Sequence, residues 1–224
     1  MKTEERERAR ELRAAGWSIK EIERSINVAR SSVSRWVRDI ELTDVHRLAL
    51  EARSGEGRLR AAAQKADAAR RIRATYQEHG RERARSSDDS YMAGCMLYWA
   101  EGEKSRWSVS ISNSDVELMR FFAAFLRQHF AVRPESMRVH LHLFPDHAGE
   151  QRDIEEHWLR ALDLPPTCLR KTILNSYSKY TRKKRTNKLP YGTCKLRVHS
   201  TQIVQTIFGS IQEFGGFERP QWLD

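Results

Sequence analysis

The sequence predicts an α+β protein with an all-α N-terminal domain, a helical linker, and an α/β domain whose antiparallel sheet is covered by helices on one face. Through residues 1–42, apolar side chains recur every three or four positions, which is the helical period. Residues 43–88 are rich in alanine and arginine and hold few large apolar side chains, which indicates a thinly packed basic helix. Across residues 89–224, alternating strand-like segments are interleaved with amphipathic helices.

The charge of the chain favours a polyanionic partner. The 224 residues include 40 Lys and Arg against 30 Asp and Glu, which gives a formal net charge of +10 at pH 7. Nucleic acid fits this charge better than a membrane surface, because the basic residues do not form one stripe on an amphipathic helix. No apolar run approaches the ~20 residues needed to cross a bilayer, and the N-terminus lacks an apolar signal core, so we expect a soluble protein.

The cysteine and histidine spacings point to no resident cofactor. Cys95, Cys168 and Cys194 are odd in number and form no Cys-x-x-Cys pair, which favours a reduced, cytoplasmic protein without disulfides. The histidines His140, His142 and His147 match no common zinc-site spacing, and a solvated strand and loop account for them.

Turn signals divide the first 40 residues into three short helices. Gly16 ends the first helix, and Ser18 with Glu21 has the spacing of a capping box that begins the second. Asn27 tolerates the left-handed conformation and ends the second helix. The third helix is expected at 30–40, with Val33, Trp36 and Val37 on its inner face.

The pattern Gly-Trp-Ser-Ile-Lys-Glu-Ile, followed by Asn-Val-Ala-Arg-Ser-Ser-Val-Ser-Arg-Trp-Val, resembles the helix-turn-helix of resolvases and many bacterial repressors. The resemblance implies that the third helix enters the major groove of DNA, where serine contacts phosphates or base edges and arginine grips guanine. Ala29 stands where a capping serine is usual, a loss of about 1 kcal/mol. A helical hairpin used only for packing is the alternative. The predicted contact residues are Arg30, Ser31, Ser32, Ser34 and Arg35.

The linker is expected to be broken at three places. Ser54-Gly55-Glu56-Gly57, His79-Gly80 and Ser86-Ser87-Asp88-Asp89-Ser90 carry the residues that usually interrupt a helix. The basic side chains between these breaks are expected either to cross a phosphate backbone or to form a solvated face interleaved with glutamate.

The stretch from Tyr91 to Lys104 is the only long apolar run of the chain, and it predicts a buried helix that ends near Gly102. Glu101 then lies at the C-terminal end of this helix, where the macrodipole opposes a carboxylate by about 0.3–1 kcal/mol. We therefore expect a compensating group: a metal ion, a lysine such as Lys104, or a partner chain.

The segment Leu97-Tyr98-Trp99-Ala100-Glu101-Gly102 resembles the second half of the LAGLIDADG motif of homing endonucleases and their non-cleaving relatives. Glu101 replaces the usual aspartate, and a core helix that ends in Glu-Gly is the alternative interpretation. The resemblance covers about residues 91–213 and implies an antiparallel sheet whose bare face lies on DNA as a saddle. In this chain the first hairpin of the family is shortened to one strand, and a helix at 150–162 is inserted.

Alternating apolar residues predict strands at 107–113, 137–144, 169–176 and 194–198. Helices are expected from Ser114 to about Phe130, at 150–162, and at 201–214. The apolar tail at 217–223 is expected to dock on its own domain or on a twin subunit.

A basic hairpin is expected between Arg170 and Arg197, where ten Lys and Arg occur without a single Asp or Glu. Such a ribbon can neutralise several phosphates of double-stranded DNA, whereas a solvated loop is the alternative. The residues of this hairpin that we expect to contact DNA are Lys179, Arg182, Lys183, Lys184, Arg185 and Lys188.

Two functions of different classes follow from these resemblances. The first is a sequence-specific DNA-binding protein that regulates transcription, which the attached helix-turn-helix favours. The second is a site-specific endonuclease, in which Glu101 binds Mg²⁺ and Lys104 or Lys195 assists the attacking water. Recognition of RNA by the basic hairpin is a third option.

A homodimer is expected in either case. The chain holds one copy of the LAGLIDADG-like motif, which leaves half of an interface unmade. Ala93 and Gly94 offer the small surfaces that allow two helices to approach closely.

Overall fold

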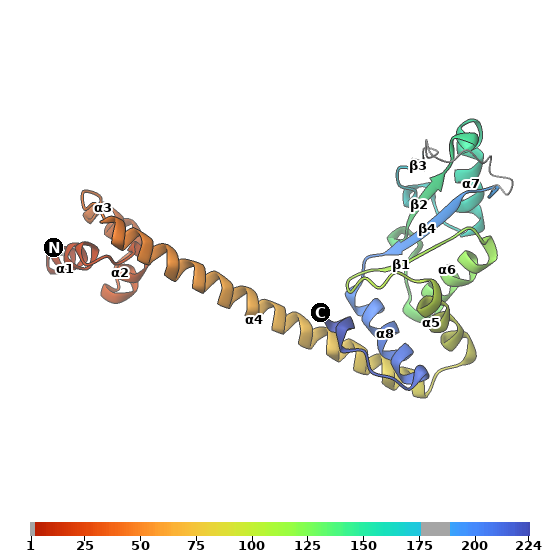
Figure 1. The fold of residues 1–224 in the computed structure, drawn as a ribbon, viewed down its shortest axis with the longest axis horizontal. Helices are drawn as coiled ribbons and strands as arrows, with labels where there is room; N and C mark the ends of the chain where they lie inside the picture. Colours follow the sequence, from red (N-terminus) through yellow and green to blue (C-terminus); the bar gives the residue numbers. More distant parts are fainter. Residues whose placement is uncertain (1–2, 176–188) are drawn as a thin grey trace. The chain divides into compact units, whose positions relative to one another are not determined.

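The computed structural model describes residues 3–175 and 189–224 (Figure 1). The chain divides into two compact units, residues 1–68 and residues 69–224. We call them the N-terminal unit and the α+β unit. The boundary falls inside one long helix, α4 (Asp44–Arg85). Among the described residues, no helix has the length and apolar character that a membrane span requires.

The N-terminal unit contains three short helices ahead of α4, as the sequence predicts. They are α1 (Thr3–Ala14), α2 (Ile19–Ile26) and α3 (Arg30–Trp36). Their shared core is small and consists of Ala9, Leu12, Ile22, Val28, Val33 and Val37.

The turns between these helices have the predicted chemistry. Ser18 and Glu21 form a reciprocal capping box at the start of α2. Gly16 and Asn27 both have positive φ, 88° and 51°, so that each chain reversal uses a residue suited to the left-handed region. Ala29 precedes α3 without a side-chain hydrogen bond, which confirms the missing cap.

The predicted breaks at 54–57 and 79–80 are wrong, because α4 is one helix of 42 residues, whereas α4 does end at Arg85, directly before the predicted break at 86–90. Gly55 and Gly57 lie inside it, and a Cβ at either position would meet no atom within 4 Å. A glycine in a helix interior costs about 0.5–1 kcal/mol relative to alanine, so this part of α4 is intrinsically weak.

The α+β unit follows the predicted order of elements. Its helices are α5 (Asp89–Glu101), α6 (Val116–Phe130), α7 (Gln151–Ala161) and α8 (Thr201–Gly215). Its strands are β1 (Val109–Asn113), β2 (Arg138–Leu143), β3 (Ile173–Leu174) and β4 (Thr193–Val198). The described part of this unit also contains short 3-10 helices at Pro134–Ser136, Pro145–Glu150, Pro166–Cys168 and Pro220–Leu223.

The sheet is mixed, which corrects the prediction of an antiparallel sheet. In the described residues the strand order is β1-β4-β2-β3, and β1, β4 and β2 are antiparallel neighbours. The edge strand β3 pairs with β2 in parallel and has only two residues. The predicted strand at 169–176 is therefore too long, and its earlier part makes a single bridge between Leu169 and Val139.

The helices lie on one face of the sheet, and the side chains of the strands alternate accordingly. Along both β2 and β4, half-buried and buried residues alternate strictly. The buried set packs against the large fully buried side chains Tyr91, Tyr98, Phe122, Trp158 and Phe208. The other set forms the face of the sheet turned away from this core.

The last turns of α4 lie alongside α8 (Figure 1). Gly80 and Gly209 permit this contact, since a Cβ on Gly80 would lie 2.1 Å from the Thr206 carbonyl oxygen and one on Gly209 would lie 1.9 Å from that of Gln77. Gln77 hydrogen-bonds to Gln205 at 2.7 Å and to Gln212 at 3.0 Å inside the same buried contact. The predicted break at Gly80 is instead a site of close helix packing.

The C-terminal tail and Gly94, which the sequence offers as possible dimer contacts, both pack within the same chain. The C-terminal tail docks on its own unit, where Trp222 stacks on Phe208 with ring centroids 4.4 Å apart. Gly94 is buried against α6, and a Cβ there would lie 2.1 Å from Phe125 Cδ2. Gly94 is therefore occupied by packing within the chain, which removes it from the argument for a dimer.

We predict that Gly209→Ala destabilises the α+β unit by about 1–3 kcal/mol, because the added methyl group overlaps the backbone of α4. Urea unfolding followed by circular dichroism measures this loss. The control is Gly57→Ala, where the space is open and helix propensity is expected to add about 0.5–1 kcal/mol. Equal stability of Gly209→Ala and the parent would contradict the close approach of α4 and α8.

Candidate functional site

The outer surface of α3 carries the residues predicted to contact DNA. Arg30, Ser31, Ser34 and Arg35 are exposed, and Ser32 is half-buried. The inner side of the same helix is held by Val33, which is completely buried. The short polar side chains and the two arginines are therefore free to meet a ligand, whereas the apolar residues fix the orientation of the helix.

An ion pair fastens the end of α3 to α1. Arg10 donates to both carboxylate oxygens of Asp39 at 2.6 and 2.7 Å and to the Trp36 carbonyl oxygen at 2.7 Å. The hydrogen bond from Arg10 lowers the pKa of Asp39 to about 2. Such a two-pronged contact is more directional than an ordinary surface pair, so it orients the segment that follows α3.

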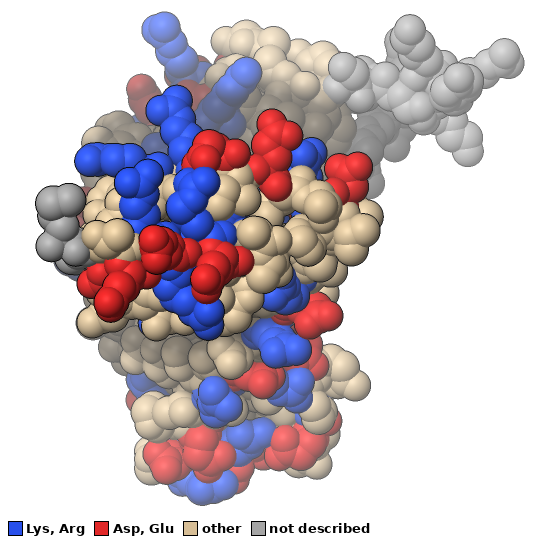
Figure 2. Space-filling view, turned by 90° about the vertical axis from the view of Figure 1, so that its left-hand side faces the viewer, with Lys and Arg blue, Asp and Glu red and all other residues tan. Residues whose placement is uncertain are grey.

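The charges on the surface seen in Figure 2 are mixed. Figure 2 shows Lys and Arg beside Asp and Glu across this face, without a broad area of one sign. The charged side chains on this surface therefore do not add up to a general positive field.

The second candidate surface lies on the side of the sheet turned away from the helices. We call it the open face and define it by Arg138, His140 and His142 of β2 together with Lys195 and Arg197 of β4. Arg138 is the register partner of Arg197, and His140 is the register partner of Lys195. Side chains of directly paired residues are neighbours, so these four lie as a basic block across the two central strands.

Glu103 is the acid that meets this basic block. Its carboxylate pairs with the Lys195 ammonium group and accepts from Arg197 at 3.3 Å. Its backbone is held by two hydrogen bonds, from its own N to the Ser110 carbonyl oxygen at 2.8 Å and from the Tyr98 hydroxyl group to its own carbonyl oxygen. Gly102 and Ile111 form an isolated antiparallel bridge beside it.

The electrostatics of the open face follow from this arrangement. Partial burial by itself raises the pKa of Glu103, but the hydrogen bond and charge of Lys195 and the charge of Arg197 outweigh it, so the pKa lies below its ordinary value. The pKa of His140 is lowered by burial and then by Arg197 and Lys195, with smaller contributions from His142 and Arg170. His140 therefore lies in a positive field that an added anion relieves.

Glu101 and Lys104 lie at the end of α5, next to the open face in sequence but with other partners. Lys104 Nζ donates to the carbonyl oxygens of Trp99 at 2.8 Å, Gly102 at 2.6 Å and Tyr98 at 3.2 Å. It thus satisfies the end of the helix as expected of a compensating lysine. The exposed Glu101 carboxylate accepts a hydrogen bond from Asn113 Nδ2 at 3.3 Å.

The sequence identifies part of this site and misses its centre. The expected contacts Lys179, Arg182, Lys183, Lys184, Arg185 and Lys188 fall outside the described residues. Glu103 is not among the residues that the sequence predicts for a site, but α5 ends at Glu101 and the Glu103 carboxylate faces Lys195. The alternation along 138–142 and 193–197 is the signal that could have identified the open face.

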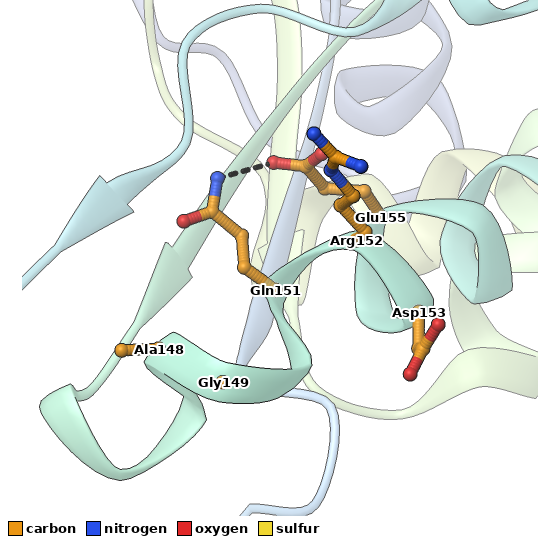
Figure 3. Close-up of a pocket in the computed structure, with 6 residues that line it drawn as sticks. All are labelled: Ala148, Gly149, Gln151, Arg152, Asp153 and Glu155. Carbon is orange, nitrogen blue, oxygen red and sulfur yellow. Dashed lines mark hydrogen bonds between the residues drawn. The ribbon is translucent and has the colours of Figure 1, made fainter.

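A surface hollow at the start of α7 has a different character. It is lined by Ala148, Gly149, Gln151, Arg152, Asp153 and Glu155. Figure 3 shows Asp153 pointing away from the pair formed by Gln151 and Glu155, whose side chains are joined by a hydrogen bond of 2.7 Å. Glu155 also accepts a hydrogen bond from the Thr172 hydroxyl group at 2.5 Å. These polar groups therefore stabilise α7 and are not a binding site for a polyanion.

Among the described residues, no three His, Cys, Asp or Glu side chains are grouped so that they could hold a metal ion. All three cysteines are free and buried. Comparison with protein-family models, with curated proteins and with solved structures found no match to this chain.

We predict that Glu103→Gln raises the affinity of the protein for polyanions, because it removes the acid that faces Lys195 and Arg197. Elution from a heparin column is expected at higher salt than for the parent. The matched control is Glu117→Gln on α6, an exposed acid that pairs with Arg120 at 3.1 Å away from the open face. A shift of equal size in both variants would reflect net charge alone and contradict a binding role for the open face.

Proposed function

We propose that this chain is a sequence-specific double-stranded DNA-binding protein that regulates transcription. The observation that carries the proposal is the surface of α3, where Arg30, Ser31, Ser34 and Arg35 are exposed on a helix fixed from behind by Val33. The sharp turn before this helix is made by Asn27 in the left-handed conformation. Three short helices with these turns support the helix-turn-helix assignment.

The chemistry of α3 suits the major groove. An arginine can donate two hydrogen bonds to the guanine edge, and serine is short enough to reach a base edge or a phosphate. The absence of a side-chain cap at Ala29 leaves the first backbone N–H groups of α3 without that partner. Contacts from this helix are few, so they select a sequence more than they supply affinity.

The open face of the α+β unit supports a second contact with DNA. In this proposal Arg138, Lys195 and Arg197 neutralise phosphates, and His140 becomes protonated as a phosphate approaches. The saddle-like use of a bare sheet face is what the resemblance to LAGLIDADG proteins implies. The basic residues at 179–188 belong to the same proposal and are expected to extend this phosphate contact.

The alternative function, a Mg²⁺-dependent endonuclease of the homing type, needs free groups at the end of α5. Lys104 is engaged with three carbonyl oxygens, and Lys195 is paired with Glu103. The contacts of Lys104 support regulation over cleavage, because this lysine would have to leave three carbonyl oxygens before it could assist an attacking water beside Glu101. A second subunit would have to bring the further carboxylate that a metal-dependent cleavage requires.

We predict that Arg35→Ala relaxes the choice of DNA sequence, with a loss of about 1–3 kcal/mol at its own base pair and little change in binding to random DNA. Selection from a randomised duplex library, followed by fluorescence anisotropy on the selected site, measures both effects. Arg8→Ala on α1 is the control, since this exposed arginine pairs with Glu11 at 2.9 Å. Unchanged preference in Arg35→Ala would remove α3 from the recognition surface.

We predict that Glu101→Gln keeps DNA binding and that the parent does not nick its selected site in Mg²⁺. The amide preserves the shape of the side chain and its contact with Asn113, and it removes a charge that the helix dipole opposes by about 0.3–1 kcal/mol. Incubation of bound DNA with Mg²⁺ and gel analysis of the strands provides the test. Cleavage by the parent that disappears in Glu101→Gln would establish the endonuclease instead.

A further inference from the structure

The first half of α4 exposes large apolar side chains on one side. Val45, Leu48 and Leu59 are 74%, 66% and 73% exposed, although each could have been polar at no cost to the chain's own core. With Ala52, Gly55 and Ala62 they continue at alternating intervals of three and four residues. That spacing is the heptad repeat by which two helices pack along a shared seam.

This seam is not used by the N-terminal unit itself. The contacts of that unit with α4 come from other sides of the helix, where the Arg53 guanidinium group pairs with Glu21 at 3.3 Å and the His46 ring lies against Gly16. The segment also contains Gly55 and Gly57 in open space, which weakens an isolated helix. An exposed apolar seam on an intrinsically weak helix indicates that another helix covers it.

The charges beside the seam decide how that helix runs. One flank of the seam repeats every seven residues, directly before Val45 and its equivalents. It is occupied by the charged residues Asp44, Glu51, Arg58 and Lys65. In a parallel pair of identical helices, Glu51 would face Glu56 of the other copy, and Lys65 would face Arg70, so both contacts would be repulsive. A parallel dimer is therefore disfavoured.

In an antiparallel pair, this charged flank of one helix lies against the same flank of the other helix, which runs in the opposite direction. In the register that places Leu48 against Leu59 of the other copy, Asp44 lies opposite Lys65 and Glu51 lies opposite Arg58. Each contact occurs twice by symmetry, and all four join opposite charges. A shift of one heptad in either direction places Arg58 opposite Arg58 or Glu51 opposite Glu51, so the charge pattern selects one register.

We propose that α4 is the dimerisation element of this protein, and that residues 44–65 form an antiparallel coiled coil with the same residues of a second copy. Leu48 packs against Leu59, Val45 packs against Ala62, and Ala52 packs against Gly55 in its core. Gly55 has no Cβ, so the two helices approach closely at the centre of the seam. Within one chain, the Asp44 carboxylate pairs with Arg47 at the long distance of 3.7 Å, and in the proposed dimer it exchanges this contact for Lys65 of the other copy.

The test is the oligomeric state of the full chain without DNA, measured by analytical ultracentrifugation. The parent is expected to be a dimer. Glu51→Arg and Arg58→Glu are each expected to weaken association by about tenfold or more, because each change creates two like-charge contacts per dimer. The double variant, Glu51→Arg with Arg58→Glu, is expected to recover the affinity of the parent.

A second pair of variants tests whether the apolar residues of the seam, and not exposed apolar residues of α4 in general, hold the dimer together. Leu59→Glu is expected to give a monomer with an unchanged melting temperature of the α+β unit. The matched control Ile72→Glu alters a 53% exposed apolar residue of the same helix outside the proposed seam and is expected to leave the dimer intact.

Three results would overturn the proposal. A parent that is monomeric at tens of micromolar excludes the coiled coil. Tighter association of Glu51→Arg shows a parallel dimer, in which the new arginine faces Glu56. A dimer that both Leu59→Glu and the single charge reversals leave unchanged is formed by another surface.

Discussion

The close approach of α4 and α8 is the constraint on which the α+β unit depends. Glycine is the only residue type that fits at positions 80 and 209. A Cβ on Gly80 would lie 2.1 Å from the Thr206 carbonyl oxygen, and one on Gly209 would lie 1.9 Å from the Gln77 carbonyl oxygen. The glutamine amides in the contact are buried, and burying such groups is tolerable only when they are hydrogen-bonded. Gln77 meets this condition by bonding to both Gln205 and Gln212, so the contact specifies one register of α4 on α8.

The position of α8 also determines the geometry of the open face, because α5 connects the two. The Tyr91 hydroxyl group hydrogen-bonds to Ser210 of α8 at 2.8 Å, which fixes the start of α5. At its other end, the Tyr98 hydroxyl group holds the carbonyl oxygen of Glu103. The acid that faces Lys195 is therefore positioned by a helix anchored on the opposite side of the unit, and the charge balance of the open face depends on core packing.

Local chemistry is what the sequence predicts well. The capping box at Ser18, the left-handed Asn27 and the alternation of β2 and β4 depend on near neighbours, and the structure confirms each. The predictions that are wrong depend on distant groups. Gly80 is typical of a helix break until α8 is placed beside it, and the parallel pairing of β3 is set by the path of the chain after α7. Glu103 was missed because its role depends on Lys195, far along the sequence.

The proposed function would explain why one chain joins two modest binding surfaces. In that proposal, α3 offers few side chains for affinity, and the open face offers charge but little to distinguish one base from another. Linking them makes the second contact intramolecular, which raises overall affinity without new interactions. If α4 also pairs with its copy, two-fold symmetry duplicates α3, and the matching DNA is an inverted repeat whose half-site spacing reports the geometry of the dimer.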